Sequence, residues 1–222
     1  DSLTAQTNKV RLNKMWQQAA NLKAQTVYTP KMDAYFQVWN DRTASKEAWQ
    51  QGYPLKPHAN TKYIFSDSTF LRVQPSNSLG SKLFVLYKSH NTTLEGGNFI
   101  GDRWAHDYSP VVDNNSISRN SHEFGSLCAI IGSENLTIKN IKMSDSHGDC
   151  LGVAGTDIRH TGITGGGNGV VRDGEFETIN LTIENCTFDY ARRNGMSVVD
   201  ARGVLIQNCV VRNTGAGYPI QT

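Results

Sequence analysis

The chain has 222 residues, of which 38% are hydrophobic, and a formal net charge of +2 from 22 basic and 20 acidic residues. A chain of this kind can bury a substantial core without disulfide bonds, so one elongated domain or two small ones are expected. The balanced charge argues against nucleic acid or an anionic membrane surface as the main partner. No run of 18 or more apolar residues is present, so no membrane insertion is expected.

Residues 1–40 are predicted to form a capping helix and a first strand. Most hydrophobic residues of "NKVRLNKMWQQAANLKAQ" recur at helical spacing, namely Val10, Leu12, Met15, Trp16, Ala19, Ala20 and Leu22. The segment "TVYTPKMDAYFQV" follows as a β segment that is interrupted by Pro30. An amphipathic helix at this place is suited to cover the open hydrophobic end of a repeat structure.

Residues 41–222 contain a repeated pattern of two short apolar alternations that differ in phase by one residue. Four segments superimpose without gaps: "NTTLEGGNF" from Asn91, "NLTIKNIKM" from Asn135, "NLTIENCTF" from Asn180 and "GVLIQNCVV" from Gly203. The phase changes at Gly96, Asn140, Asn185 and Asn208. Glycine and asparagine best tolerate the backbone of a one-residue corner. Each segment is therefore predicted to be two strands joined by a corner, because a single strand keeps one phase.

The spacing of these segments predicts a solenoid. The last two lie 23 residues apart, and the earlier spacings of 44 and 45 residues are close to twice that period. The longer spacings are interpreted as one coil plus an insertion, near residues 104–124 and 157–179. A period in the low twenties is typical of a solenoid with one β coil per turn. Coils stack about 4.8 Å apart, so Asn140, Asn185 and Asn208 are expected to hydrogen-bond along the axis. A leucine-rich repeat is the competing solenoid, but its leucine pattern and helical half are missing.

A second marker of the repeat is a glycine before an apolar run. Gly125 in "GSLCAII" and Gly148 in "GDCLGVA" are 23 residues apart, and Gly195 in "GMSVV" is interpreted as their equivalent.

With a helix, "TVYTP", Tyr35 and these coils in order, the chain resembles the pectate-lyase-like superfamily of right-handed parallel β-helices. This superfamily includes domains of bacteriophage tailspikes and of extracellular polysaccharide lyases, hydrolases and epimerases. The most similar stretches are "EGGNFIGDRWAH", "HEFGSLCAIIGSENLTIKNI", "SHGDCLGV" and "ARRNGMSVVDARGVLIQNCVVRNTGAG". The resemblance implies an all-β fold, a right-handed parallel β-helix (solenoid) with an N-terminal capping α-helix. It also implies an extracellular or virion (phage tail) location, a homotrimer or larger virion assembly, and a polysaccharide or cell-surface glycan as partner.

The sequence departs from several enzymes of this superfamily. The paired aspartates and Gly-His-Gly of polygalacturonase-like hydrolases, the Arg-x-Pro-x-x-Arg of pectate lyases and the Asp-Pro-His of alginate epimerases are absent. The resemblance therefore implies the fold and leaves the reaction open. Relatives continue into further coils after a corner like that in "NTGAGYPIQT", so more coils are expected beyond residue 222.

The sequence predicts no cofactor or metal, and nothing in it supports calcium. Cys128, Cys150, Cys186 and Cys209 show no C-x-x-C spacing and lie in apolar runs, so they are interpreted as buried, reduced thiols. The segment "GITGGGNG" at residues 162–169 lacks the lysine of a P-loop and is interpreted as the tip of an insertion.

The candidate site lies where polar residues follow the coils on one edge of the solenoid. Four residues after the last inward position of each coil stand Arg103, His147, Arg192 and Gly215. Chemistry on uronate polymers needs a cation, a base and an acid, whereas glycoside hydrolysis needs two carboxyl groups. The candidate catalytic residues are therefore His147, Asp149, Asp102 and Glu123. The candidate substrate-binding residues are Arg103, His106, His122, Arg192, Asn194 and Trp104. For each charged residue the alternative is structural, since Asp and Arg after a corner often bind backbone groups or each other.

Three functions remain open from the sequence. The first is a β-helix that binds and cleaves a surface polysaccharide, by lyase or hydrolase chemistry, in a phage tailspike or secreted enzyme. The second is a non-catalytic receptor-binding or structural virion protein. The third is an extracellular polysaccharide epimerase. All three use the same fold, because a scaffold does not fix its chemistry.

Overall fold

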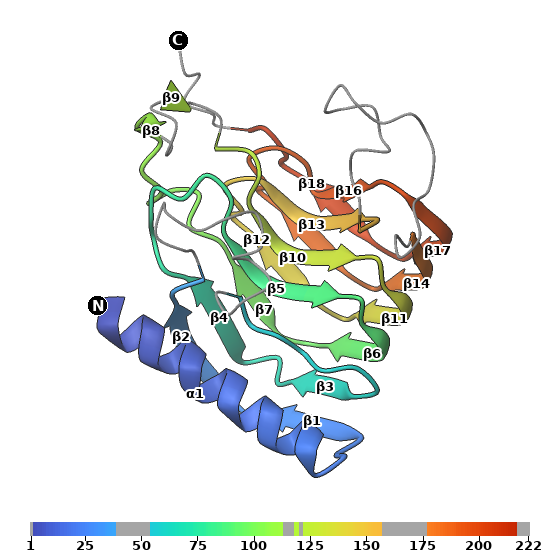
Figure 1. The fold of residues 1–222 in the computed structure, drawn as a ribbon. Coiled ribbons are helices and arrows are strands. Elements are labelled where there is room, and N and C mark those ends of the chain that lie inside the picture. Colours follow the sequence, from blue (N-terminus) through green and yellow to red (C-terminus); the bar gives the residue numbers. More distant parts are fainter. Residues whose placement is uncertain (1, 39–53, 113–117, 120–121, 157–176, 217–222) are drawn as a thin grey trace.

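A computed structural model describes residues 2–38, 54–112, 118–119, 122–156 and 177–216 (Figure 1). Most of the second predicted insertion, including "GITGGGNG", therefore lies outside the described residues. The single α-helix in these ranges is α1 (Ser2–Asn21). It is not long and apolar enough to cross a membrane.

The strands form three parallel sheets and one small hairpin. Sheet A contains β1 (Thr26–Thr29), β3 (Lys62–Phe65), β6 (His90–Glu95), β11 (Glu134–Lys139), β14 (Thr178–Glu184) and β17 (Ala201–Gln207). Sheet B contains β2 (Met32–Phe36), β4 (Thr69–Val73), β7 (Asn98–Ile100), β12 (Lys142–Ser144), β15 (Thr187–Asp189) and β18 (Val210–Arg212). Sheet C contains β5 (Lys82–Tyr87), β10 (Ser126–Ile131), β13 (Asp149–Ala154) and β16 (Met196–Val198). The hairpin pairs β8 (Val111–Val112) with β9 (Ser118–Arg119).

The chain visits the three sheets in turn and so winds into stacked coils, as Figure 1 shows. Each strand pairs in parallel with the strand one coil away; for example, β11 pairs with β6 on one side and β14 on the other. The predicted right-handed parallel β-helix is confirmed, and the leucine-rich alternative is wrong, because every side of the coil is a strand.

The corners between sheets A and B form the predicted column. Gly96, Asn140, Asn185 and Asn208 all have positive φ, between 52° and 78°. The backbone N–H of Asn140 donates to Glu184 O, and that of Asn185 donates to Gln207 O, each at 3.1 Å. The axial hydrogen bonds at this corner thus run through the backbone. A side-chain amide ladder forms instead at the corner before β14, where Asn180 Nδ2 donates to Asn135 Oδ1 at 3.1 Å.

The core consists of the inward residues of successive coils. In the coils that begin at Asn135 and Asn180, all the predicted inward residues are at most 1% exposed: Leu136, Ile138, Ile141, Met143, Leu181, Ile183, Cys186 and Phe188. The equivalent Ile206 and Val211 of the last coil are 44% and 48% exposed, because none of the described residues covers that side of β17 and β18. Cys186 and Cys209 occupy equivalent positions on neighbouring coils.

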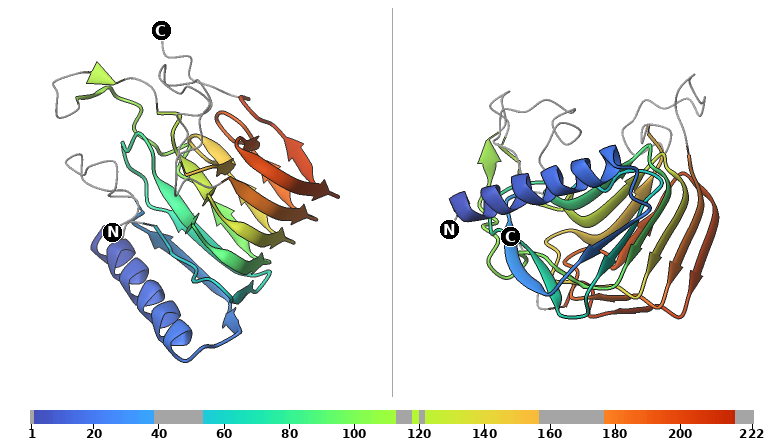
Figure 2. Two further views of the ribbon diagram at one scale, coloured as in Figure 1. Left: turned by 45° about the vertical axis from the view of Figure 1, so that its right-hand side comes forward. Right: turned by 90° about the horizontal axis from the view of Figure 1, so that it is seen from below.

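Helix α1 lies across the first coils and covers their interior (Figure 2). Trp16 is 1% exposed and contacts the rings of Tyr63 and Phe84 at 4.9 and 6.1 Å. The predicted capping helix is confirmed. Its buried face is narrower than the sequence suggested, since Val10, Met15 and Leu22 are exposed, whereas Ala5, Lys9, Leu12 and Trp16 are buried.

Candidate functional site

The histidine cluster, which consists of Asp102, His106, His122 and His147, lies where the first insertion meets the coils. All four residues are buried. The Nδ1 atoms of His106 and His147 each lie 2.8 Å from a different oxygen of Asp102. His106 Nε2 lies 2.9 Å from His122 Nδ1, and His122 Nε2 lies 3.1 Å from the carbonyl oxygen of Ser109. One carboxylate therefore joins His147, from the corner before β13, to two histidines of the insertion.

The hydrogen bonds of this cluster fix the positions of most of its protons. An ionised Asp102 only accepts, so both Nδ1 atoms bound to it carry protons, and the Ser109 carbonyl requires a proton on His122 Nε2. The contact between His106 Nε2 and His122 Nδ1 requires one further proton. Burial and the neighbouring His106 lower the pKa of His122, which opposes that extra proton. Burial acts to raise the pKa of Asp102, but the hydrogen bonds from His106 and His147 hold it well below its usual range.

His147 is neutral in this arrangement. Burial lowers its pKa against the opposing effect of the Asp102 hydrogen bond. With the proton on Nδ1, the lone pair of Nε2 is left without a hydrogen-bond partner among the described atoms. Nε2 faces Gly125, because a Cβ atom on that glycine would collide with it. His147 is thus packed against the backbone of Gly125, the residue before β10, and is only 2% exposed.

The lowered pKa of His147 predicts a loss of stability in mild acid. Below the ordinary histidine pKa of about 6.5, the unfolded chain binds a proton that the buried ring does not, so the free energy of unfolding falls with pH. His147→Asn keeps an N–H donor for Asp102 and removes the titration. Urea unfolding between pH 7 and pH 5 is expected to show a shallower pH slope for this variant than for the wild type. Equal slopes would show that His147 binds its proton alike in both states.

Asp102, His106 and His147 also offer atoms that lie within 4.8 Å of one another, a spacing that can suit a metal ion. The rings of His106 and His147 are stacked 4.2 Å apart at an interplanar angle of 22°. The lone pairs of their Nδ1 atoms therefore lie in separate, nearly parallel planes and do not converge on one point. Shared protons account for the contacts with Asp102 better than a shared metal ion does.

Both predicted substrate-binding arginines are buried and bind the backbone. Arg103 Nη1 donates to Tyr190 O at 2.6 Å, and Arg103 Nη2 donates to Ala216 O. Arg192 Nη1 donates to His122 O at 3.2 Å, and its guanidinium lies 4.7 Å from the centre of the Tyr108 ring. These contacts tie successive coils and the insertion together.

Trp104 is the accessible aromatic residue next to the histidine cluster, and its side chain is 60% exposed. Its Nε1 donates to Asp145 Oδ1 at 2.8 Å, and its ring meets that of Tyr190 edge-on at 6.1 Å. A fixed, exposed indole of this kind can stack on the apolar face of a sugar ring.

A second polar group lies at the start of the sheet C strands, and we call it the Lys82–Asp149 column. Lys82, Ser126 and Asp149 are direct neighbours across β5, β10 and β13. None of the three belongs to the hydrophobic core; Lys82 is partly exposed, whereas Ser126 and Asp149 are buried, at 8% and 7% exposed. Lys82 donates to Phe124 O at 2.9 Å, and burial lowers its pKa to about 8.

Asp149 is held by the next coil. Its Oδ1 accepts from the backbone N and Nδ2 of Asn194 at 3.0 and 3.2 Å, and its Oδ2 accepts from Ser197 Oγ at 2.7 Å. Arg193 Nε lies 3.6 Å from Asp149 Oδ1, with its side chain 41% exposed. Glu123 is exposed, and its backbone oxygen would lie 2.8 Å from a Cβ atom on Gly148, the residue before Asp149, so it is near this end of sheet C.

The structure divides the predicted site residues into these two groups. Asp102, His106, His122 and His147 come together in the histidine cluster, and Asp149 and Asn194 come together in the Lys82–Asp149 column. The sequence analysis missed Lys82, Arg193 and Ser197. An alignment of "KLFVLY" with "SLCAII" and "DCLGVA" would have found Lys82. The pairing of Ser126 with Asp149 confirms Gly125 and Gly148 as equivalents, but Leu151 pairs with Met196, so the prediction for Gly195 is wrong; Gly195 is equivalent to Cys150.

A family model described as "Right handed beta helix region" matches residues 58–221. The chain belongs to this family. Two relatives of the chain come from Bacillus subtilis. The SPβ prophage-derived uncharacterized protein YorA is 27% identical over 164 residues, which is 74% of this chain and 26% of that protein. Protein YclG is 27% identical over 159 residues, which is 71% of this chain and 24% of that protein. The chain thus spans about a quarter of the length of these curated relatives.

Solved structures of low sequence identity share the β-helix fold. A putative glycosyl hydrolase from Parabacteroides merdae superimposes with a TM-score of 0.62 at 11% identity, over 93% of this chain and 89% of that one. The A-module of the mannuronan C-5 epimerase AlgE4 from Azotobacter vinelandii gives a TM-score of 0.56 at 11% identity, over 93% of this chain and 54% of that one. At this identity the likeness establishes the fold alone.

Proposed function

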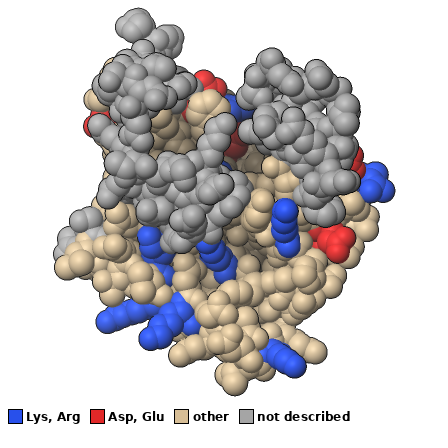
Figure 3. Space-filling model, viewed as in Figure 1, with Lys and Arg blue, Asp and Glu red and all other residues tan. Residues whose placement is uncertain are grey.

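We propose that this β-helix binds a polysaccharide across the outer face of sheet C and cleaves it beside the Lys82–Asp149 column. The observation that carries the proposal is the column itself, in which an amine on β5 and a carboxylate on β13 are in register on either side of Ser126 of β10. Sheet C faces the viewer in Figure 1, and Figure 3, drawn from the same side, shows Lys and Arg side chains over α1 and over the lower part of this face.

The residues of this column suit elimination from a uronate polymer. Lys82, with a pKa of about 8, is partly unprotonated near neutral pH. It can accept the proton of the carbon atom next to the uronate carboxyl group. The exposed guanidinium of Arg193 can neutralise that carboxyl group, and Asp149 or Glu123 can donate a proton to the leaving oxygen. Hydrolysis would instead use Asp149 and Glu123 as the pair of carboxyl groups.

The floor of the proposed face is built from small residues, which lets a sugar chain approach the backbone. Gly152 of β13 pairs with Ala129 on one side and Ser197 on the other. Among the described residues, a Cβ atom on Gly152 would meet nothing nearer than the Ser126 side chain at 3.9 Å. The described part of the chain thus leaves space at this position, and a long side chain placed there would cover the floor.

A non-catalytic receptor-binding or structural virion role is the second candidate. It is favoured by the burial of Asp102, His147 and Asp149, three predicted catalytic residues that substrate cannot reach without a rearrangement. The prophage origin of one relative supports a virion location, and a homotrimer is proposed only from the resemblance to tailspikes. The epimerase alternative has less support, because the Asp-Pro-His motif is absent from the sequence.

The test is incubation of the full chain with a panel of capsular and uronate polysaccharides, followed by analysis of chain length. Unsaturated uronic acid ends would identify a lyase, and reducing ends without unsaturation would identify a hydrolase. Binding without any shortening would leave the adhesion role. Asp149→Asn is expected to lower the cleavage rate about 100-fold or more, as loss of a general acid or base does. If Asp149→Asn and His147→Ala both keep full activity, the predicted catalytic residues are wrong.

The binding face is tested with a pair of variants at one position. Gly152→Met is expected to abolish polysaccharide binding by covering the floor, while Gly152→Ala keeps it. Both side chains point into open space, so unfolding measurements should show that neither variant destabilises the protein appreciably. Unchanged binding by Gly152→Met would place the polysaccharide on another face.

A further inference from the structure

A groove crosses the corner at the other end of sheet C, where its strands pass into sheet A. It consists of two adjoining hollows of about 270 and 200 Å³, which meet at Lys88 and Ser89. The first hollow lies between the segment at residues 56–59 and β5, and the second extends to Glu134 and Glu177. The groove thus follows the same corner over successive coils, parallel to the axis of the solenoid.

The charges of the groove differ between its two ends. In the first hollow the charged side chains are those of Lys56 and Lys88, next to the imidazole of His58. Burial lowers the pKa of both Lys56 and His58, which shows that water is partly excluded there and that an ion pair is less screened. The acidic residues Glu134 and Glu177 line only the second hollow.

The wall of the first hollow is fixed by residues of the helix and the core. Asn13 of α1 accepts from the backbone N of Lys56 at 3.0 Å and donates to Pro54 O at 3.0 Å. The hydroxyl of Tyr63, which is 0% exposed, accepts from the backbone N of His58 at 2.8 Å. The lysine and the histidine are therefore carried on a segment that is anchored at two points.

The lining of the first hollow suits a sugar ring better than a bare ion. Pro57, Ala59 and Val85 provide an apolar floor, and Tyr87 adds an aromatic ring whose centre lies 5.6 Å from Lys88 Nζ. A sugar that carries an acidic substituent presents both an apolar C–H face and a negative charge. The volume is below the range of about 300–1,000 Å³ typical of pockets for drug-sized ligands, which agrees with one or two sugar units.

We propose that this groove is a second carbohydrate subsite and that its first hollow holds the carboxylate or sulfate group of an acidic sugar. The inference rests on the proposed function and deepens it by assigning a binding place, away from the Lys82–Asp149 column, to the acidic group of the polysaccharide. Glu134 in the second hollow would accept hydrogen bonds from the hydroxyl groups of the following sugar. Glu177 is already paired with Arg202 at 3.1 Å.

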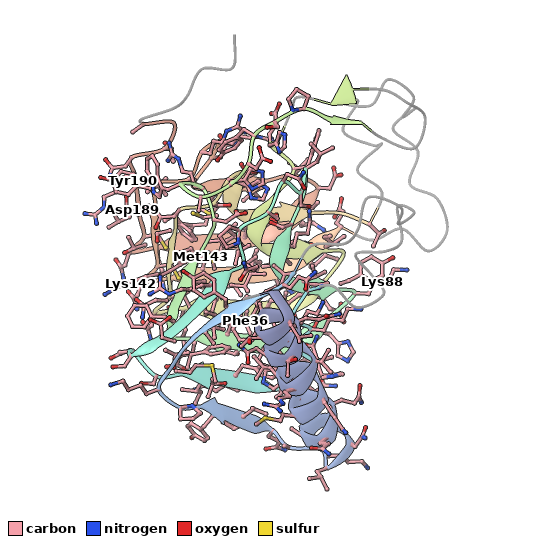
Figure 4. All side chains as sticks on the ribbon, turned by 90° about the vertical axis from the view of Figure 1, so that its left-hand side faces the viewer. Phe36, Lys88, Lys142, Met143, Asp189 and Tyr190 are labelled. Atoms are coloured by element: carbon pink, nitrogen blue, oxygen red, sulfur yellow. The ribbon has the colours of Figure 1, made fainter. Side chains whose placement is uncertain are left out.

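The experiment measures binding of tetrasaccharides to the full chain by calorimetry. The probes are galacturonate, mannuronate and sulfated galactan tetrasaccharides, neutral maltotetraose, and sodium sulfate alone. Lys88→Met and Lys56→Met are each expected to weaken binding of the acidic tetrasaccharide about tenfold or more, as loss of a charged hydrogen bond does. Lys142→Met is the matched control, because Lys142 is exposed and lies on the opposite side of the solenoid from Lys88 (Figure 4).

Several outcomes would overturn the subsite. The first is that the two lysine variants bind the acidic tetrasaccharide as tightly as the wild type does. The second is that maltotetraose binds as tightly as every acidic probe. The third is that an equal concentration of sodium sulfate fully displaces the acidic tetrasaccharide. Cleavage assays separate this result from a failure of the proposed function. If the wild type and Lys88→Met cleave a polymer alike and bind acidic probes alike, only the subsite is wrong. If the wild type binds no polysaccharide of the panel, both proposals are wrong.

Discussion

Asp102→Asn is expected to lower the free energy of unfolding by about 3–5 kcal/mol, the usual cost of removing one partner from a buried ion pair. The carboxylate accepts from His106 and His147 at 2.8 Å and from the backbone N of Ser76 at 3.3 Å. An amide of the same size offers one acceptor and one donor, so at least one buried N–H loses its partner. The buried rings of His106 and His147 also lose the negative charge beside them. Urea unfolding at pH 7 measures the change.

Asp33→Asn is the control for this prediction. Asp33 Oδ1 lies 2.6 Å from Arg72 Nε, a contact as short as those of Asp102, but the Asp33 side chain is 57% exposed. Water screens an exposed pair of this kind, so the loss is expected to stay below about 1 kcal/mol. Equal losses for the two variants would show that the histidine cluster contributes no more stability than a surface ion pair.

Gly125→Ala is expected to destabilise the protein by about 1–3 kcal/mol through overpacking. The new Cβ atom would overlap Nε2, Cε1 and Cδ2 of the His147 ring. That ring is held by Asp102 and stacked on His106, so it cannot rotate away without breaking the cluster. The glycine is therefore needed for the close approach of this ring.

A double-mutant cycle with His147→Ala isolates the overlap from other effects of the substitution. When the ring is absent, Gly125→Ala is expected to cost much less than in the wild type, because the space beside residue 125 is then empty. Gly152→Ala in the same sheet serves as the control, and its effect is expected to be near zero or stabilising by up to about 1 kcal/mol. A cost of Gly125→Ala that does not depend on His147 would contradict the packing described here.

The two polar groups differ in what they can do. The histidine cluster is buried, its carboxylate is fully hydrogen-bonded, and it joins an insertion to the coils. The Lys82–Asp149 column reaches the surface at Lys82 and Arg193 and lies next to an open floor at Gly152. We therefore expect substitutions in the cluster to act mainly on stability, and substitutions in the column to act on binding and cleavage.

Much of the architecture follows from the sequence alone, because the repeat is local and regular. The one-residue phase changes at Asn140, Asn185 and Asn208 predict the corners, and the alternation on either side predicts which residues face inward. Coils of nearly equal length must then stack in register. The polar residues after each coil are thereby placed on one edge, which is how Asp102 and His147 were found without coordinates.

The insertions obscured the rest of the site. Lys82 stands 44 residues before Ser126 and 67 before Asp149. Its place in the column therefore depends on how many residues of the first insertion are left out when the coils are aligned. The misplacement of Gly195 has the same cause at the second insertion. The burial of these polar side chains could not be predicted from the sequence either. A histidine or aspartate after a corner can point to solvent or lie beneath an insertion with the same local pattern.

The sequence by itself determined the β-helix, its corners, its core and the edge on which its polar residues gather, since each depends on the spacing of neighbouring residues. Only the tertiary structure decided that one carboxylate is shared by two stacked histidines, that the predicted arginines bind backbone carbonyls, and that Lys82 meets Asp149 across β10. The physical reason is that, apart from the contact of Asp102 with His106 four residues away, these contacts join residues 45 or more positions apart through a fold with insertions of unequal length. Their distances and burial are set by packing between coils, which no local pattern encodes.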